Sequence, residues 1–276
     1  MSVQSFIPSV WEGKLLKQFR KTAIADLITS KPTKIEGNKI IFNRTGAVAV
    51  KDYTGNVSWD DIDTTPIELN MDQKKYFAFA VDDVDAVQAA GELIDPHVEE
   101  ANAEVKEVID SFILGLYTGA DADNVIGSDE TPVALDKLNV YDYIVNLGTK
   151  LSKKKVPQTD RYVIIDAEIL GLLSKDDRFT RQPVVLTNGV VEGQKINGMQ
   201  VVVSEELPEL NGVHARVLAL HKSAIGFGKQ IEKTEAMRLQ NAFKDGVRGL
   251  FVYGAEVIRP EALAVLTFSV APTNQA

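Results

Sequence analysis

The stretch DGVRGLFVYGAEVIRPEALAVLTFSV, residues 245–270, carries two runs of strand-forming residues. Its apolar and β-branched side chains predict one strand over 247–258 and a last strand over 262–270, with Arg259-Pro260 between them. Another strand-like segment, 231–239, comes just before, and Asp245-Gly246 is typical of a turn between strands. This part of the chain therefore predicts a long hairpin followed by a short final strand.

Residues 35–81 predict another long hairpin upstream. Strand-like runs lie at 40–42, 47–50, 67–71 and 76–79, and the run 67–71 alternates strictly between apolar and polar side chains. Between the runs, the segment 51–61 holds turn residues and carboxylates but few apolar side chains. Because a two-stranded hairpin buries too little apolar surface to be stable alone in water, something outside it must hold it.

The N-terminal part of the chain predicts an amphipathic arm. Apolar residues recur every four positions over 9–30, which is typical of a helix, and Lys31-Pro32 ends it. Residues 1–44 carry a net charge of +5, whereas residues 45–110 carry −12. Segregated charge is compatible with two solvated surfaces, or with attraction between the basic part of one copy and the acidic part of another.

From Asp82 to Gly119, apolar spacings of three, four and seven predict one long helix, which Pro96 kinks or splits. The cluster Asp82, Asp83 and Asp85 is interpreted as the cap of this helix. A cation site is disfavoured because the further oxygen ligands and the turn glycine of a calcium loop are missing.

Residues 135–221 predict alternating helices and strands. Helical spacing covers 135–152, the apolar run 161–165 suits a buried strand, and a helix is expected over 167–174. Asn188-Gly189 between two apolar runs predicts a tight hairpin, and further strands are expected at 199–204 and 217–221.

Composition excludes several classes of protein. The chain has 276 residues, 45% of them hydrophobic, and no cysteine, so disulfides and thiolate chemistry are excluded. A net charge of −9 disfavours a conventional nucleic-acid binder. The first residues lack the pattern of a signal peptide, and no apolar run reaches the ~18 residues of a membrane span, so no membrane association is expected.

The candidate chemical motifs are weak. No serine lies in a Gly-x-Ser-x-Gly elbow, and the three histidines, His97, His214 and His221, lack metal-ligand spacing. Gly226-Phe227-Gly228-Lys229 lacks most of a phosphate-binding motif and is interpreted as a turn between strands. Lys153-Lys154-Lys155 is interpreted as a solvated helix exit.

The order of these elements resembles the major capsid protein of tailed bacteriophages, a fold shared with encapsulin shells and the floor of the herpesvirus capsid. The resemblance extends over nearly the whole chain, and the stretches that carry it are 7–11, 198–208 and 245–263. It implies an α+β fold with an N-terminal arm (1–35), an extended β-loop (36–81), a peripheral domain with a long spine helix and hairpin (82–119 and 226–258), and a compact axial domain (120–225 and 259–276).

The same resemblance implies the function and the partners. The protein would be a non-enzymatic subunit without cofactors that forms pentamers and hexamers of an icosahedral shell in the virion, assembled in the bacterial cytoplasm. Because the arm begins at Met1, a separate scaffolding protein is expected, together with a portal protein and only weakly bound DNA. The subunit-interface candidates come from the arm, the extended β-loop and the long hairpin: Trp11, Arg20, Lys51, Asp52, Tyr53, Trp59, Asn241 and Asp245. No Lys51–Asn241 isopeptide crosslink is expected.

Two alternatives stay open. One is another assembly protein, either an encapsulin-like compartment or a tail tube subunit. The other is an α/β enzyme that acts through carboxylates such as Asp82 and Asp166.

Overall fold

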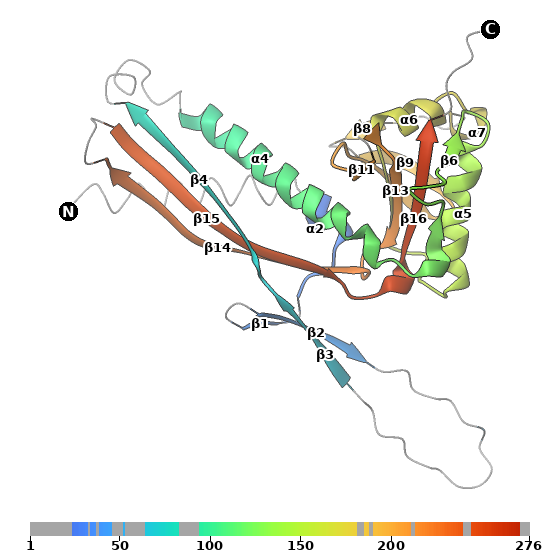
Figure 1. Ribbon diagram of the computed structural model, residues 1–276, viewed down its shortest axis with the longest axis horizontal. Helices are drawn as coiled ribbons and strands as arrows, with labels where there is room; N and C mark the ends of the chain where they lie inside the picture. The colour runs from blue at the N-terminus through green and yellow to red at the C-terminus, as the bar shows by residue number, and fades with distance from the viewer. Residues whose placement is uncertain are drawn as a thin grey trace.

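The computed structural model describes residues 24–32, 34–36, 39–45, 52, 64–82, 94–180, 185–187, 190–210, 213–239 and 244–270. It has three visible parts: a body of helices and strands, a long sheet with one helix beside it that extends from this body, and a narrow hairpin that leads away from both (Figure 1). Within the described ranges, no helix combines the length and apolar character that a membrane crossing needs.

The long sheet is built on the predicted hairpin. Strands β14 (Ile225–Arg238) and β15 (Lys244–Val257) pair antiparallel along their length, which confirms this hairpin. The predicted turn at Asp245-Gly246 is wrong, because both residues lie inside β15, opposite Arg238 and Met237. Gly246 also pairs with Ala80 on the other side, so it has a strand neighbour on each side and cannot form the turn.

Strand β4 (Gln73–Asp82) completes this sheet in the order β14-β15-β4. It pairs antiparallel with β15, from Gln73 opposite Tyr253 to Asp82 opposite Lys244. The run 76–79 therefore joins the long sheet and not the upstream hairpin. Asp82 is the last residue of β4, and Asp83, Asp85 and the residues up to 93 lie outside the described part of the chain, so the predicted cap stays a prediction.

Helix α4 (Ile94–Leu114) lies along the long sheet and continues into the 3₁₀ helix η2 (Gly115–Gly119) (Figure 1). This confirms the later part of the predicted long helix. Pro96 lies in the first described turn, where a missing N–H leaves no helical hydrogen bond unmade, so it does not interrupt the described helix. The ring of Phe112 meets that of Tyr253 edge-on at 5.5 Å, which packs α4 against β15.

The narrow hairpin is the base of the extended β-loop. Strands β2 (Lys39–Thr45) and β3 (Thr64–Asn70) pair antiparallel from Lys39 opposite Asn70 to Thr45 opposite Thr64, and β1 (Lys34–Glu36) lies on the other side of β2. The predicted alternation is confirmed, because Leu69 and Met71 are buried and Asn70 is exposed. The run 47–50 lies outside the described residues.

The body contains an eight-stranded mixed sheet flanked by helices. Its buried centre is β7, where all five residues are buried, as predicted, and α6 follows directly after Asp166. The Asn188-Gly189 hairpin is confirmed by the pairing of Thr187 with Val190. In sheet order the strands are β5 (Val125–Ile126), β16 (Leu263–Val270), β13 (Arg216–His221), β7 (Arg161–Ile165), β10 (Met199–Val203), β9 (Val190–Ile196) and β8 (Val185–Thr187), with β6 (Val133–Leu135) also on β16.

The remaining elements of the body cover this sheet or connect it to the long sheet. They are the helices α5 (Val140–Lys153), α6 (Ala167–Leu173) and α7 (Asp177–Thr180), the 3₁₀ helices η3 (Ala122–Asn124) and η4 (Pro260–Ala262), and the small pair β11 (Glu209–Leu210) and β12 (Val213–His214). One hydrophobic core runs through the body and under α4.

Of the predicted arm helix, the structure describes α2 (Ile24–Ile28), which ends before Lys31-Pro32 as expected. Ala25 and Ile28 are buried in the main core. The chain then makes a parallel bridge to β14 between Ser30 and Gly226.

Candidate functional site

The extended β-loop is fixed to the long sheet at its base. Side chains of β2 and β3 form a second hydrophobic cluster with side chains of the β15 region; its buried members are Ile40, Phe42, Leu69, Met71, Val252 and Ile258. Because this cluster is separate from the main core, the loop has an anchor of its own. The sequence predicted that the β2–β3 hairpin needs support from outside itself. At its base, Val252 and Ile258 of the same chain give this support.

Glycines in the long sheet make room for this anchor. A Cβ at Gly226 would collide with Phe42 and Ile258, and one at Gly228 would collide with Ile40. Gly226-Phe227-Gly228-Lys229 lies inside β14, so its interpretation as a turn is wrong: the two glycines serve close packing in a strand. A Cβ at Gly254 of β15 would lie 2.5 Å from the carbonyl oxygen of Asn70.

Replacing Gly254 with alanine should therefore weaken the anchor. The clash is with backbone atoms, which cannot turn away, so Gly254→Ala should lower the free energy of unfolding by about 1–3 kcal/mol. Urea unfolding of the unassembled protein measures this. Gly171 of α6 is the matched control because a Cβ there meets nothing within 4 Å; Gly171→Ala should be neutral or raise stability by about 0.5–1 kcal/mol. Equal effects of the two variants would contradict the packing role of Gly254.

Helix α4 packs on one face of the long sheet, and the base of the extended β-loop covers part of the other face. Phe77 of β4 lies 5.6 Å from Phe251 on the face that carries Tyr253 toward α4. On the opposite face Tyr76 is 80% exposed, and Ala78 and Ala80 are exposed as well. Side chains directly opposite in a sheet share a face, so Tyr76 lies beside Leu250. An exposed aromatic side chain between Lys74 and Ala78 of the same strand suits a protein contact.

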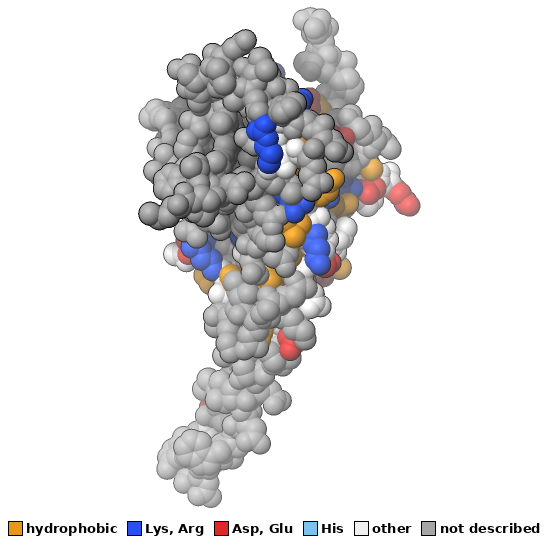
Figure 2. Space-filling model, turned by 90° about the vertical axis from the view of Figure 1, so that its left-hand side faces the viewer, with side chains coloured by type: hydrophobic (Ala, Val, Ile, Leu, Met, Phe, Trp, Pro, Cys, Tyr) orange, Lys and Arg blue, Asp and Glu red, His pale blue; other side chains and the backbone are white. Residues whose placement is uncertain are grey.

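This sheet also carries basic side chains. Lys74 and Lys75 of β4, Arg238 of β14 and Arg248 of β15 are exposed. Figure 2 views the molecule from the end of the long sheet that lies away from the body. Lys and Arg side chains lie beside hydrophobic ones there among the described residues. The segment 46–63 of the extended β-loop is acidic, with one lysine and four aspartates. The segment 46–63 is therefore acidic, whereas the long sheet has exposed basic side chains on both of its faces.

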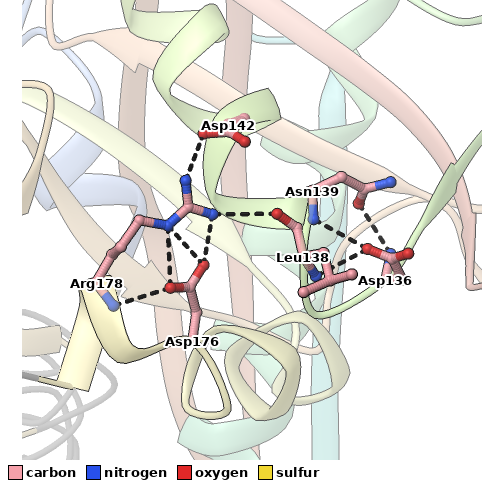
Figure 3. A network of polar contacts seen from close by, with 6 residues as sticks. All are labelled: Asp136, Leu138, Asn139, Asp142, Asp176 and Arg178. Carbon is pink, nitrogen blue, oxygen red and sulfur yellow. Dashed lines mark hydrogen bonds and ion pairs between the residues drawn. The ribbon is translucent and has the colours of Figure 1, made fainter.

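A third candidate contact lies in the body, at the turn between β6 and α5. Leu138 is 71% exposed there, yet its turn is held by hydrogen bonds: Asp136 Oδ1 accepts from the N–H of Leu138 at 2.8 Å and of Asn139 at 2.9 Å. Asn139 Oδ1 in return accepts from the N–H of Asp136 at 2.9 Å (Figure 3). The exposed leucine is thus presented on a rigid turn.

Arg178 of α7 fastens this turn to the rest of the body. Its Nη2 donates to the carbonyl oxygen of Leu138 at 3.1 Å, and its guanidinium pairs with Asp176 at 2.7 Å and Asp142 at 2.8 Å (Figure 3). It also lies over the ring of Tyr141, 4.8 Å from the centroid. The hydrogen bonds from Arg178 lower the pKa of the Asp176 carboxyl. Tyr141 and Asp142 of α5 and Asp176 just before α7 therefore converge on Arg178 behind Leu138.

The predicted interface residues fall mostly outside the described part of the chain. These are Trp11, Arg20, Lys51, Tyr53, Trp59 and Asn241. Asp52 is described and exposed, in the segment between β2 and β3. Asp245 belongs to β15, opposite Val81 and Arg238. The structure thus places Asp245 in the long sheet. The contacts of all eight residues with neighbouring subunits stay predictions.

The residues considered for chemistry have structural roles. Asp166 is buried and caps α6, accepting from the N–H of Ile169 at 2.7 Å, whereas Asp82 lies at the end of β4 in the separate long sheet. Lys154 pairs with Asp121 at 3.0 Å and Asp123 at 2.7 Å. In the described ranges, no three His, Asp or Glu side chains gather closely enough to hold a metal ion.

His221 is also integrated into the fold. Its Nδ1 accepts a hydrogen bond from the N–H of Ser223 at 3.1 Å, and burial lowers the pKa of its ring. The Nδ1 of His221 therefore stabilises a turn after β13.

Comparison with known proteins gives a family. The model of a family described as phage capsid protein matches residues 67–266, which include the long sheet, α4 and most of the body. The chain belongs to this family. No curated protein sequence matches it.

Solved structures agree with the capsid family. A structure of Mycobacterium phage Che8 is similar with 28% identity and a TM-score of 0.65, covering 89% of this chain and 91% of that one. The capsid of Cyanophage P-SCSP1u has 19% identity and a TM-score of 0.68, covering 91% and 89%. A virus-like particle from Pyrococcus furiosus has 12% identity and a TM-score of 0.58, covering 94% and 99%. The last two likenesses show the shared fold.

The protein is therefore a major capsid protein of a bacteriophage, a structural subunit that self-assembles into the shell of the virion. Sequence patterns missed two of its candidate contact residues, Tyr76 and Leu138. A tyrosine in a continuous apolar run and a leucine before a helix both predict burial, so their exposure could not be anticipated. The sequence did contain one sign that Leu138 lies in a turn. Asp136 and Asn139, on either side of Lys137-Leu138, are both residues that favour turns.

Proposed function

We propose that this capsid protein forms pentamers and hexamers that close into an icosahedral shell around a double-stranded DNA genome, and that it has no catalytic activity. Assembly takes place in the bacterial cytoplasm with a separate scaffolding protein and a portal protein. The observation that carries the proposal is the paired base of the extended β-loop, β2 and β3, which has its own anchor on the long sheet and leads away from the body (Figure 1). Such a projection has no use in a monomer and suits a grip on a neighbour.

We further propose that different segments of the chain have different roles in the shell. The arm (1–35) and the extended β-loop contact neighbouring subunits, the spine helix and long sheet form the peripheral domain, and the body forms the axial domain. With β4 in the long sheet, the peripheral domain takes in residues 73–82 as well. The acidic segment 46–63 would meet the basic side chains of a neighbour's long sheet, and Trp11, Arg20, Lys51, Asp52, Tyr53, Trp59, Asn241 and Asp245 are the proposed contact residues of these parts.

Electron microscopy of the purified protein, with and without its scaffolding protein, tests the assembly. Closed shells that enclose DNA when a portal and packaging motor are supplied support the proposal. Tubes would favour a tail protein, and a cargo enzyme inside the shells would favour an encapsulin-like compartment. A discrete small oligomer with activity that is lost in an Asp82→Asn or Asp166→Asn variant would favour an enzyme. The acidic net charge should also make DNA binding weak and sensitive to salt.

The exposed side chains of Tyr76 and Leu138 give a prediction about contacts in the shell. Tyr76→Asp and Leu138→Asp should each leave the melting temperature of the unassembled protein within about 2 °C of the parent, because neither side chain is buried. Each should reduce the yield of shells at least tenfold, since a charge placed in an apolar contact is not compensated. Lys137→Asp, which adds negative charge at an exposed neighbour of Leu138, is the control. Normal shell yields in both variants would remove these residues from the interface.

A further inference from the structure

Asp110 is a buried carboxyl group between the spine helix and the end of the arm. It lies on α4 with 3% of its surface exposed, and its Oδ1 accepts the N–H of Ala25 at 3.0 Å. Ile109 and Ile113 of the same helix belong to the core in which Ala25 and Ile28 are buried. Asp110 therefore closes a polar contact inside an otherwise apolar junction between two segments that are far apart in the sequence.

Residues 24–30 have further attachments to β14. Asp26 forms an ion pair with Lys229 at 2.6 Å, and both side chains are partly exposed. Ser30 donates its N–H to the carbonyl oxygen of Ile225 at 2.9 Å and accepts from the N–H of Phe227 at 3.3 Å. This segment, which we call the docking segment, is the described connection between the arm and the rest of the subunit.

The charges around Asp110 do not balance its own. Two charged side chains act on the Asp110 carboxyl. Lys106 lies one turn before it on α4, and Glu206 lies in the loop after β10. The carboxylate of Asp26 on α2 is engaged with Lys229. Among the described residues, no Lys or Arg lies within ion-pair distance of Asp110. Burial raises the pKa of its carboxyl to about 6, although the N–H groups of Ala25 and Ile24 and the charge of Lys106 act in the opposite direction.

We propose that Asp110 is a proton-sensitive latch, which holds the docking segment firmly against the spine helix when neutral and loosely when ionised. This inference goes beyond the proposed function and concerns the single subunit. When the docking segment leaves, the carboxyl group meets water and its pKa returns to about 4. The docked form then binds a proton over the interval from about pH 4 to 6 that the open form does not bind. Docking is therefore strongest at the acidic end of this interval and weakens as pH rises through 6.

Hydrogen exchange of the unassembled full chain tests the latch. The backbone amides of residues 24–30 should open more often as pH rises from 4.5 to 8, after correction for the intrinsic exchange rate, by about 25-fold for pKa values of about 6 when docked and about 4 when open. Asp110→Asn keeps an acceptor for the N–H of Ala25 but cannot ionise. This variant should show closed-state protection at every pH, with up to about 100-fold rarer opening than the parent at pH 8.

The control is Asp26→Asn, which removes the partly exposed ion pair to Lys229. It should increase opening by the same factor at each pH between 5.5 and 8 and leave the dependence on pH in place. The proposal is overturned if the parent protein shows no pH dependence of opening in this segment, or if Asp110→Asn and the parent open equally often at pH 8. Because exchange is measured before assembly, failure of the latch and failure of shell formation are observed separately.

Discussion

Deletion of residues 51–61 should leave the subunit folded and abolish closed shells. The β2–β3 pairing extends over 39–45 and 64–70, and the anchoring cluster uses Ile40, Phe42, Leu69 and Met71, all outside the deleted segment. The melting temperature of the unassembled protein should therefore change by less than about 2 °C. Shells should fail to form because the deleted residues are the proposed grip on the neighbouring subunit. Scanning calorimetry and negative-stain microscopy measure the two effects.

A second variant separates the length of this segment from its chemistry. Replacing residues 51–61 with a Gly/Ser linker of the same length keeps the reach of the loop and removes Asp52, Asp60 and Asp61 together with the aromatic side chains. It should also fail to assemble. Shells from the linker variant alone would assign the grip to the backbone, and normal shells from the deletion variant would show that the loop is not a subunit contact.

Much of the fold follows from local patterns. The buried strand 161–165, the hairpin across Asn188-Gly189 and the pairing of 231–239 with 247–258 were all predictable, because each depends on side-chain alternation or on turn residues within a short segment. The charge of the acidic loop could also be predicted, since charge is a property of composition.

The errors share one cause, which is long-range pairing. Asp245-Gly246 has the composition of a turn, but β4 pairs with β15 at this point and makes the same residues part of a central strand. Gly226 and Gly228 have the composition of a loop, but they are needed where β2 crosses β14. A glycine required for close packing and a glycine required for a turn look the same in the sequence. Only the position of the distant strand distinguishes them.

The candidate contact surfaces show the same limit. The extended β-loop was predictable as a hairpin that needs support, but its support on Val252 and Ile258 was not. The exposure of Tyr76 depends on which face of the long sheet α4 covers, and no local pattern determines that. The role of Asp110 was equally hidden, because its partner Ala25 lies 85 residues away.

The second large effect concerns stability and should follow from substitution of Arg161. This side chain is 2% exposed, and its guanidinium donates to four neutral acceptors at the end of α5. Nε contacts the carbonyl oxygen of Pro157 at 2.7 Å, Nη1 contacts that of Gly148 at 3.2 Å and Ser152 Oγ at 2.9 Å, and Nη2 contacts the carbonyl oxygen of Val156 at 2.5 Å. Carbonyl groups at a helix end need such partners, and they carry the negative end of the helix dipole.

Arg161→Met should lower the free energy of unfolding by about 3–5 kcal/mol, because it leaves buried carbonyl groups without donors. Arg161→Lys keeps the charge, but a single ammonium group cannot reach four acceptors that surround a planar fork, so it should lose about 2 kcal/mol or more. Urea unfolding of the unassembled protein measures both. Lys154→Met, at a partly exposed side chain near the same helix end, is the control and should have a much smaller effect. If Arg161→Lys were as stable as the parent, the positive charge would be what matters, and the fixed geometry of the four hydrogen bonds would not be the source of the stability.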